Sequence, residues 1–279
     1  IFMLPDDKRL RMLGGRPRPD TTRQRRNNRD GSRRSTKDLP VSLDWRDKDG
    51  SNWVTSIKDQ GSCGSCWAFS TVGTAESEFL IGLDKPYLRD YMDLSEQHQV
   101  SCDHTCWPPP DDEYCNGGCD GGWPNLASDF LISTGVPDEG CFPYTSGSSG
   151  TEPPCNNRCG DWISRTKKIC SWQWINEGES VNQTNVKTGL QYAPLSVCMR
   201  CCSDFSSYSG GLYENTCGVW GWEGWHAVIL VGYRDDYSPG YWRMKNSWGT
   251  TWGDNGYCYL AYSESDYGES RFCTDALLH

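Results

Sequence analysis

The cysteine content limits what this chain can fold into more than any other feature of its sequence. Sixteen of the 279 residues are cysteines, and so many thiols suit an oxidising compartment, where they pair as disulfides. We therefore expect a protein of the secretory pathway, either lysosomal or vacuolar or extracellular. The sequon Asn182-Gln183-Thr184 agrees with this interpretation and marks a candidate glycoprotein.

Metal binding is the alternative interpretation of the cysteines. Spacings such as Cys115-x-x-x-Cys119 and Cys198-x-x-Cys201 could hold a metal, but zinc sites usually combine repeated knuckles or added histidines. The chain has only four histidines, and none lies beside these cysteines. We expect neither a metal nor another cofactor.

Charge divides the chain near residue 38. Residues 1–38 hold 12 Lys and Arg against 5 Asp and Glu, whereas residues 39–279 hold 15 against 32. The basic segment has few apolar residues after Leu13, so alone it is expected to be disordered. We interpret it as the remnant of a propeptide or as a docking arm for the acidic body or another acidic surface. Nucleic acid is disfavoured as a partner because no aromatic residue interleaves the arginines.

The chain offers no candidate for a membrane span, because its longest apolar run is far shorter than the ~18 residues that a span needs. The first residues also lack the pattern of a signal sequence. We expect any targeting segment to have been removed or to lie outside this sequence.

Hydrophobic periodicity and turn signals divide the acidic body into two parts. Residues 39–160 carry helical patterns that begin at Cys66, with Ser65 as a candidate N-cap, at Ser95, and at Pro124. Residues 161–279 instead carry short β-branched and aromatic runs separated by Gly, Pro and Asp. These predicted strands are Leu195–Met199, Ala227–Tyr233, Tyr241–Asn246 and Tyr257–Ala261. The expected fold is α+β, with a helical lobe, an antiparallel sheet lobe and a cleft between them.

The strongest local motif is Gln60-Gly-Ser-Cys-Gly-Ser-Cys66-Trp-Ala-Phe-Ser. Cys66 falls where a Gly- and Ser-rich loop turns into a helix, and helix N-termini favour a thiolate. A nucleophilic thiolate needs a proton-exchanging partner and a group that orients this partner. His226 in a predicted strand and Asn246 in a Gly/Trp-rich turn are candidates for these two roles. Taken singly, such a cysteine is more often half of a disulfide, and such a histidine is more often a core residue.

The three segments together resemble the papain/cathepsin family of cysteine peptidases. Cys-Gly-Ser-Cys-Trp is a motif of that family. Further family landmarks follow in family order along residues 39–279: Leu39-Pro40 through Asp44-Trp45-Arg46, Leu94-Ser95-Glu96-Gln97, Cys119-Asp-Gly-Gly122-Trp123-Pro124, His226-Ala227-Val228 and Asn246-Ser247-Trp248-Gly249 through Tyr257. His226 and Asn246 follow Cys66 by 160 and 180 residues, more than the family's roughly 130–150. Long Cys-rich loops account for the extra length.

The resemblance implies a papain-like fold of two lobes, with a helical lobe at about residues 39–160, a barrel-like sheet lobe at about 161–279 and the active site in the cleft. It implies that Cys66 is the thiolate that attacks the peptide carbonyl and that His226 is its imidazolium partner and the acid that protonates the leaving amine. Asn246 would orient His226, and Trp248 would shield their hydrogen bond. Gln60 would join the Cys66 backbone N–H in an oxyanion hole.

The resemblance also implies where substrate binds. Gly122 would pair its backbone with an extended peptide. The main specificity pocket would be lined by Trp123, Pro124, Cys198, Ala227 and Leu278. Because this lining is apolar, we expect a preference for hydrophobic or aromatic residues at the second position before the cleaved bond.

Endopeptidase activity is the expected mode, because the devices of the family's exopeptidases are missing. Residues 141–159 lack the His-His pair of a cathepsin B occluding loop, and the spacing from Gln60 to Cys66 lacks the cathepsin X insertion. In detail the chain is most similar to cathepsin C catalytic domains, through Cys141-Phe-Pro-Tyr144 and Asp44-Trp45-Arg46 to Asn52-Trp53-Val54. Residues 1–38 are too short to be the exclusion domain on which cathepsin C's aminopeptidase activity depends.

Family pairing implies the disulfides Cys63–Cys119, Cys102–Cys155 and Cys217–Cys273, and the cathepsin C resemblance adds Cys141–Cys159. Cys106–Cys115 is a further candidate, and the partners of the remaining cysteines stay open. The predicted activity is hydrolysis of peptide or protein substrates. The rival hypothesis is a catalytically silent scaffold that has kept the fold, although no catalytic position is degraded.

Overall fold

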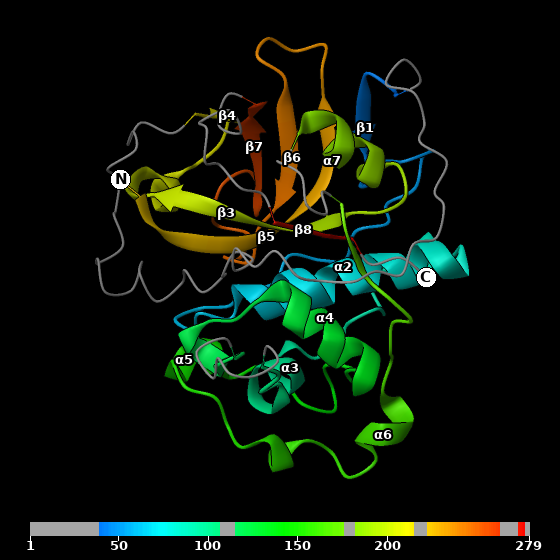
Figure 1. The fold of residues 1–279 in the computed structure, drawn as a ribbon, viewed down its shortest axis with the longest axis vertical. Helices are drawn as coiled ribbons and strands as arrows, with labels where there is room; N and C mark the ends of the chain where they lie inside the picture. The colour runs from blue at the N-terminus through cyan, green and yellow to red at the C-terminus, as the bar shows by residue number, and fades with distance from the viewer. Residues whose placement is uncertain (1–38, 107–114, 176–181, 215–221, 263–272, 277–279) are drawn as a thin grey trace.

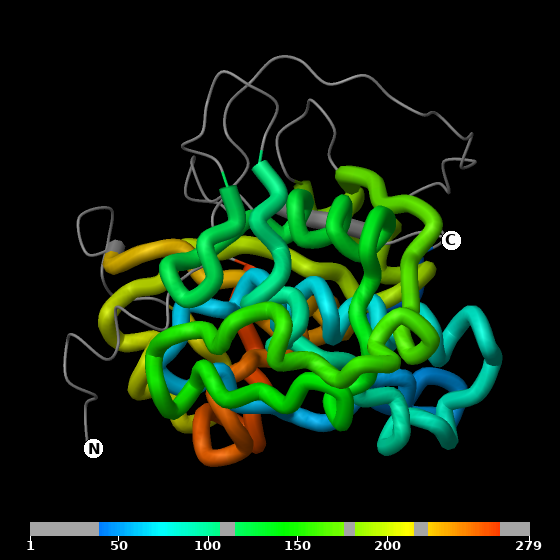
Figure 2. The backbone as a smooth tube through the Cα atoms, turned by 90° about the horizontal axis from the view of Figure 1, so that it is seen from below, coloured from blue at the N-terminus to red at the C-terminus, as the bar shows by residue number. Residues whose placement is uncertain are grey.

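The computed structural model describes residues 39–106, 115–175, 182–214, 222–262 and 273–276. Figure 1 shows two parts: the sheet occupies one half of the molecule, and most of the helices occupy the other, with α2 lying lengthwise between them. Seen at 90° in Figure 2, the green helices and loops lie in front of the yellow and orange strands. The predicted α+β arrangement of a helical part beside a sheet is therefore confirmed.

The helices lie mostly before residue 170. The α-helices are α2 (Cys66–Leu83), α3 (Glu96–Cys102), α4 (Pro124–Ser133), α5 (Ser146–Ser149), α6 (Trp162–Arg165) and α7 (Gln183–Leu190). Short 3₁₀ turns are η2 (Pro86–Leu88), η3 (Gly118–Asp120), η4 (Cys155–Asn157) and η5 (Ser203–Ser207).

The strands form one mixed sheet. They are β1 (Ser42–Asp44), β2 (Gln173–Trp174), β3 (Leu195–Cys202), β4 (Leu212–Tyr213), β5 (Trp222–Arg234), β6 (Tyr241–Lys245), β7 (Tyr257–Ala261) and β8 (Cys273–Ala276). Their order is β2-β8-β3-β5-β6-β7-β4, and β1 pairs with β5. Among the strands that the structure describes, only the β4–β7 pair is parallel. The predicted barrel is wrong: the two-residue strands β2 and β4 are the opposite ends of this order, and within the described residues no ladder joins them, so the sheet stays open.

The long strand β5 connects the two parts of the molecule. Residues 226–231 are buried without alternation, because α2 covers one face of the strand and the sheet-lobe core covers the other. β3 pairs with β5 in antiparallel register, which places Cys198 opposite Ala227 and Leu195 opposite Leu230. β1, from the range expected to form the helical lobe, pairs with β5 through Leu43 opposite Tyr233.

Each part has its own apolar core. In the sheet part, large aromatic side chains such as Trp45, Trp242 and Phe205 are buried with the aliphatic residues of β3 and β5. The helical part packs Leu80 of α2 and Phe130 of α4 with neighbouring aliphatic residues. Aromatic area therefore supplies much of the apolar burial in a chain with few aliphatic residues.

Four disulfides tie the loops of the helical part. They are Cys63–Cys119, Cys102–Cys155, Cys106–Cys115 and Cys141–Cys159, all among the pairs expected from the sequence. Cys202, whose partner was left open, is also disulfide-bonded. The predicted Cys217–Cys273 pair falls outside the described side chains. No helix among the described residues is long and apolar enough to cross a membrane.

Candidate active site

The candidate nucleophile Cys66 is the first residue of α2 and is fully buried. The loop before it is fastened to the helical part by the Cys63–Cys119 disulfide and by a 2.9 Å hydrogen bond from Gly64 N to Cys119 O. Across the boundary between the two parts, the Ala227 N–H of β5 donates to Cys66 Sγ at 3.4 Å. The thiol therefore lies where the helix start meets the central strand.

His226 precedes Ala227 on β5 and forms the second element of the site. Its Nε2 lies 2.7 Å from Asn246 Oδ1. Ser247 N also donates to Asn246 Oδ1, at 2.8 Å. The backbone N–H of Ser247 identifies this Asn246 atom as the amide oxygen, which can only accept hydrogen bonds. His226 Nε2 must therefore be the protonated ring nitrogen. The other ring nitrogen, Nδ1, is then free to accept a proton.

The surroundings of His226 disfavour the charged imidazolium that the family resemblance implies. Burial lowers its pKa to about 4, against the opposing effect of the Asn246 hydrogen bond. The Trp248 ring lies against the imidazole, with ring centroids 4.6 Å apart and planes inclined by 30°. Within the described part of the chain, His226 Nδ1 is buried and has no hydrogen-bond partner. The arrangement suits a base that is shielded from water and ready to take a proton.

Gln60 is held in the same region by both ends of its side-chain amide. Its Nε2 donates to Cys63 O at 2.9 Å, and its Oε1 accepts from Ser247 Oγ at 2.7 Å. Gln60 N also donates to Ser247 O at 2.9 Å. Ser247 was not predicted from the sequence to be a functional residue. The only signal that could have indicated such a role is its position next to Asn246.

The expected substrate-binding residues lie on both sides of Cys66. Gly122 approaches the ring of Trp67, the residue after the candidate nucleophile, so closely that a Cβ would fall 2.7 Å from it. Trp123 and Pro124 are buried at the start of α4. Cys198 and Ala227 form a small apolar cluster with Cys66. Leu278 falls outside the described residues.

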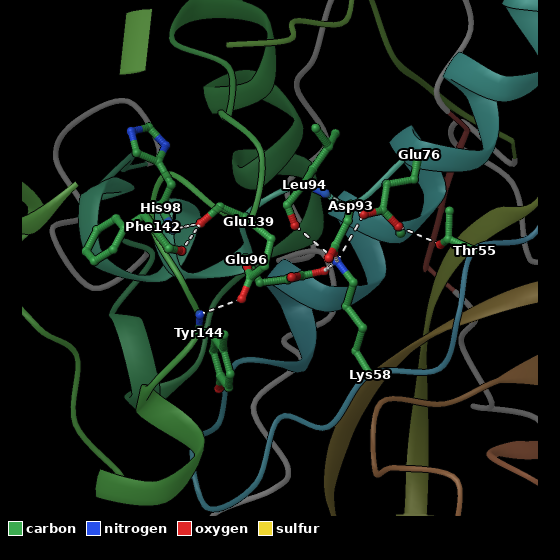
Figure 3. A network of polar contacts seen from close by, with 12 residues as sticks. Thr55, Lys58, Glu76, Asp93, Leu94, Glu96, His98, Glu139, Phe142 and Tyr144 are labelled. Carbon is green, nitrogen blue, oxygen red and sulfur yellow. Dashed lines mark hydrogen bonds and ion pairs between the residues drawn. The ribbon is translucent and has the colours of Figure 1, made fainter. Parts of the chain in front are cut away.

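A network of charges, most of them buried or partly buried, lies behind the site and was not expected from the sequence. Lys58 Nζ, at its centre, bonds to Glu76 Oε1 (3.0 Å), Glu96 Oε1 (2.7 Å), Asp93 Oδ1 (2.8 Å) and Leu94 O (3.0 Å). Figure 3 shows these carboxylates pointing toward the ammonium group from separate segments.

The network reaches the sheet through Thr55. Its Oγ1 donates to Glu76 Oε2 at 2.5 Å, and Lys245 of β6, next to Asn246, donates to Thr55 O at 3.0 Å. These contacts join the helical part to the strand that precedes the candidate site. Lys58, Glu76 and Lys245 also line a small, partly open pocket of about 20 Å³ with Ser70, Ala227 and Asn246.

A thiol at a helix start, bonded to the residue that follows a histidine, and an imidazole bonded to an amide are the groups that nucleophilic acyl transfer needs. Comparison with known proteins identifies the family. The model of the papain family cysteine proteases matches residues 39–274, and the chain belongs to that family.

Similar proteins agree with this assignment. The chain is 38% identical to cathepsin B-like CP2 of Giardia intestinalis, over 79% of this chain and 68% of that protein. It is 34% identical to a cathepsin L-like proteinase of Fasciola hepatica, over 80% of this chain and 60% of that protein. Some relatives are longer, and the chain covers 42% of the cysteine protease RD21B of Arabidopsis thaliana.

Solved structures share the fold. The proform of the ragweed pollen cysteine protease Amb a 11 superposes with a TM-score of 0.67 and 29% identity, over 85% of this chain and 66% of that one. Procathepsin B S9 of Trypanosoma congolense gives a TM-score of 0.77 over 98% of this chain and 88% of that one; at 22% identity it supports the fold alone. Family and relatives support a cysteine endopeptidase function, and the predicted papain-like hydrolase is confirmed. The similarity to cathepsin C in particular stays a prediction.

Proposed function

We propose that Cys66 is the nucleophile of this cysteine protease and that His226 and Asn246 serve it. The proposal rests on the 2.7 Å hydrogen bond from His226 to Asn246. The next residue, Ala227, donates its backbone N–H to Cys66 Sγ. His226 takes the thiol proton, and the thiolate attacks the peptide carbonyl. His226 then protonates the leaving amine, and water hydrolyses the thioacyl-enzyme with His226 as base.

Gln60 is proposed to stabilise the oxyanion formed in both steps. Its amide is fixed by Ser247 and Cys63, so it needs little reorganisation when charge develops on the substrate oxygen. The Cys66 backbone N–H is the second proposed donor. Trp248, packed on His226, would keep water away from the imidazole–amide bond.

The substrate is proposed to be an extended peptide paired with the Gly122 backbone. Trp123, Pro124, Cys198, Ala227 and Leu278 form the proposed specificity pocket. The four of these that are described are apolar and buried, which favours a hydrophobic or aromatic residue at the second position before the cut. A peptide library tests this preference, and a dominant requirement for Arg at that position would refute it.

Residues 1–38 are proposed to be the tail of a propeptide, with the docking arm as the second interpretation. The charge difference between this basic segment and the acidic body supports either role. The proform of Amb a 11 among the similar structures favours the propeptide. With its disulfides, the protein is proposed to act in a lysosomal, vacuolar or extracellular setting.

Replacing the nucleophile tests the proposed function. Cys66→Ala should abolish peptide cleavage and labelling by an epoxysuccinyl-type thiol inhibitor. Cys170→Ala is the matched control, because Cys170 is a free but exposed cysteine; it should leave both unchanged. A protein that neither cleaves nor labels at pH 5–7 after removal of residues 1–38 would instead be a silent scaffold.

A further inference from the structure

Tyr144, which lies outside the nucleophile motif and has no role in the proposed mechanism, bonds to both flanks of the proposed oxyanion hole. Its hydroxyl donates to the backbone carbonyl of Gln60 at 2.9 Å and lies 2.7 Å from Ser65 Oγ, directly before Cys66. A carbonyl oxygen can only accept, so the Tyr144 proton is committed to Gln60, and Ser65 donates to Tyr144. One hydroxyl therefore connects the two segments that carry the proposed oxyanion donors.

The segment around Tyr144 lies in backbone contact with the loop before the nucleophile. Ser62 N donates to Gly147 O at 2.8 Å. A Cβ on Gly147 would fall 2.9 Å from Gln60 O and 3.0 Å from Tyr144 Cε1, and a Cβ on Gly61 would fall 2.3 Å from Gly147 O. Contact this close leaves the Gln60 carbonyl little room to move as long as Tyr144 stays in place.

Tyr144 is itself held from several directions. Its backbone N–H donates to Glu139 Oε1 at 2.6 Å, as Figure 3 shows. Its ring meets the Phe69 ring edge-on, with centroids 4.8 Å apart. The next residue is fixed to α3, because Thr145 N donates to Gln97 Oε1 at 2.8 Å. The Cys141–Cys159 disulfide closes the segment. These contacts fix the backbone and the ring of Tyr144, and its hydroxyl is the polar group that reaches Gln60 and Ser65.

We infer that Tyr144 is a positioning residue for the oxyanion hole, which sets the place of Gln60 relative to Cys66. The inference rests on the proposed roles of these two residues. Oxyanion donors act through preorganisation, so a small displacement of Gln60 would weaken transition-state binding more than substrate binding.

Tyr144→Phe removes only the hydroxyl and tests the inference. We expect kcat for a fluorogenic peptide amide to fall about tenfold, a part of the ~100-fold loss that deletion of a whole oxyanion donor causes, with KM changed less than about twofold. The rate at which iodoacetamide alkylates Cys66, followed by mass spectrometry, should stay unchanged, because alkylation forms no oxyanion. Tyr233→Phe, which loses a 2.8 Å bond to the Pro40 carbonyl away from the site, is the matched control and should leave kcat unchanged.

A double mutant separates positioning from other effects. When Gln60 is already replaced by Ala, adding Tyr144→Phe should change kcat less than about twofold. An unchanged kcat in the single variant, an equal fall in alkylation rate, or a full additional loss in the Gln60→Ala background would each overturn the inference. Failure of the proposed function looks different, since Cys66→Ala would then still cleave.

A second variant covers the case in which Tyr144→Phe does not fold. Gly147→Ala pushes on the Gln60 carbonyl and the tyrosine ring without removing a hydrogen bond, and it should give the same kcat-specific loss. Gly160→Ala is its control, because nothing lies within 4 Å of a Cβ placed there. Equal kcat for the two alanine variants would also refute the inference.

Discussion

Glu139 offers the sharpest test of how the buried charges behind the site respond to pH. Its Oε1 accepts the Tyr144 N–H, whereas its Oε2 is buried with no hydrogen-bond partner in the described part of the chain. Burial raises the pKa of Glu139 from 4.5 to about 7, against the opposing effects of the Tyr144 N–H and of Lys58, while Asp93 and Glu76 add to the rise. We predict that Glu139→Gln removes this part of the pH dependence of stability.

The sign follows from proton binding. The folded protein holds the Glu139 proton more tightly than the unfolded chain does, so the proton stabilises the fold fully below about pH 4.5, and this contribution is lost as the pH rises through about 7. The full difference between the folded and unfolded pKa values of Glu139 corresponds to about 3 kcal/mol of stability. Partial exposure of the side chain reduces this contribution to about 2 kcal/mol. Glutamine keeps the acceptor for Tyr144 and cannot ionise. Because part of the contribution is already lost at pH 5, the variant should gain about 1.5 kcal/mol relative to the native protein between pH 5 and pH 8.

Urea unfolding followed by tryptophan fluorescence at both pH values measures the difference. The comparison is made in a Cys66→Ala background to prevent self-cleavage. Other buried acids that titrate in this range, such as Glu96, whose pKa burial raises to about 8, are present in both proteins. Asp90→Asn, at an exposed position, is the control and should change stability little at either pH. A stability difference that is the same at pH 5 and pH 8, or larger at pH 5, would refute the reasoning.

Three further substitutions probe the network, the site and the packing beneath it. Lys58→Met should cost about 3–5 kcal/mol of unfolding free energy at pH 8, because it leaves buried carboxylates unpaired, and less at pH 5; equal losses at the two pH values would contradict this. Asn246→Ala should lower kcat at least tenfold with little change in KM, because His226 loses the acceptor that orients it; steady-state kinetics would disprove this if only KM changed. Gly122→Ala should lower stability by about 1–3 kcal/mol in thermal unfolding, because its Cβ meets the Trp67 ring; an unchanged Tm would show that the ring moves aside freely.

Features encoded within a few consecutive residues could be predicted from the sequence. The helix was expected to begin at Cys66, because a Gly- and Ser-rich loop gives way there to a helical pattern, and α2 begins at that residue. The run Tyr257–Ala261 was expected as a strand and is β7. In these segments, periodicity and turn residues agree with the tertiary environment, so the local signal is sufficient.

Features that depend on pairing between distant segments could not be predicted in the same way. The strand at Ser42–Asp44 is only three residues long, and its partner lies 190 residues further on, at Gly232–Arg234. The open edge of the sheet likewise depends on strands of two residues, which carry almost no pattern. The partly buried position of Lys58 could not be predicted either, because an isolated lysine is normally expected on the surface. Its carboxylate partners come from two other segments: Glu76 from α2, and Asp93 and Glu96 from the start of α3.

Two serines at helix starts show why a local rule can fail at a functional site. Ser95 was expected to open α3; it has an extended backbone (φ −81°, ψ 104°), and its side chain accepts the His98 N–H as an N-cap should. Ser65 was expected to cap α2, but its ψ of 12° is already close to a helical turn, and its side chain makes no capping bond. The loop before Cys66 is fixed by the Cys63–Cys119 disulfide, and it turns into the helix without the extended residue that an N-cap needs. The Ser65 hydroxyl is therefore available to Tyr144, so the same constraint that places Cys66 at the helix start also supplies the contact on which the positioning of Gln60 depends.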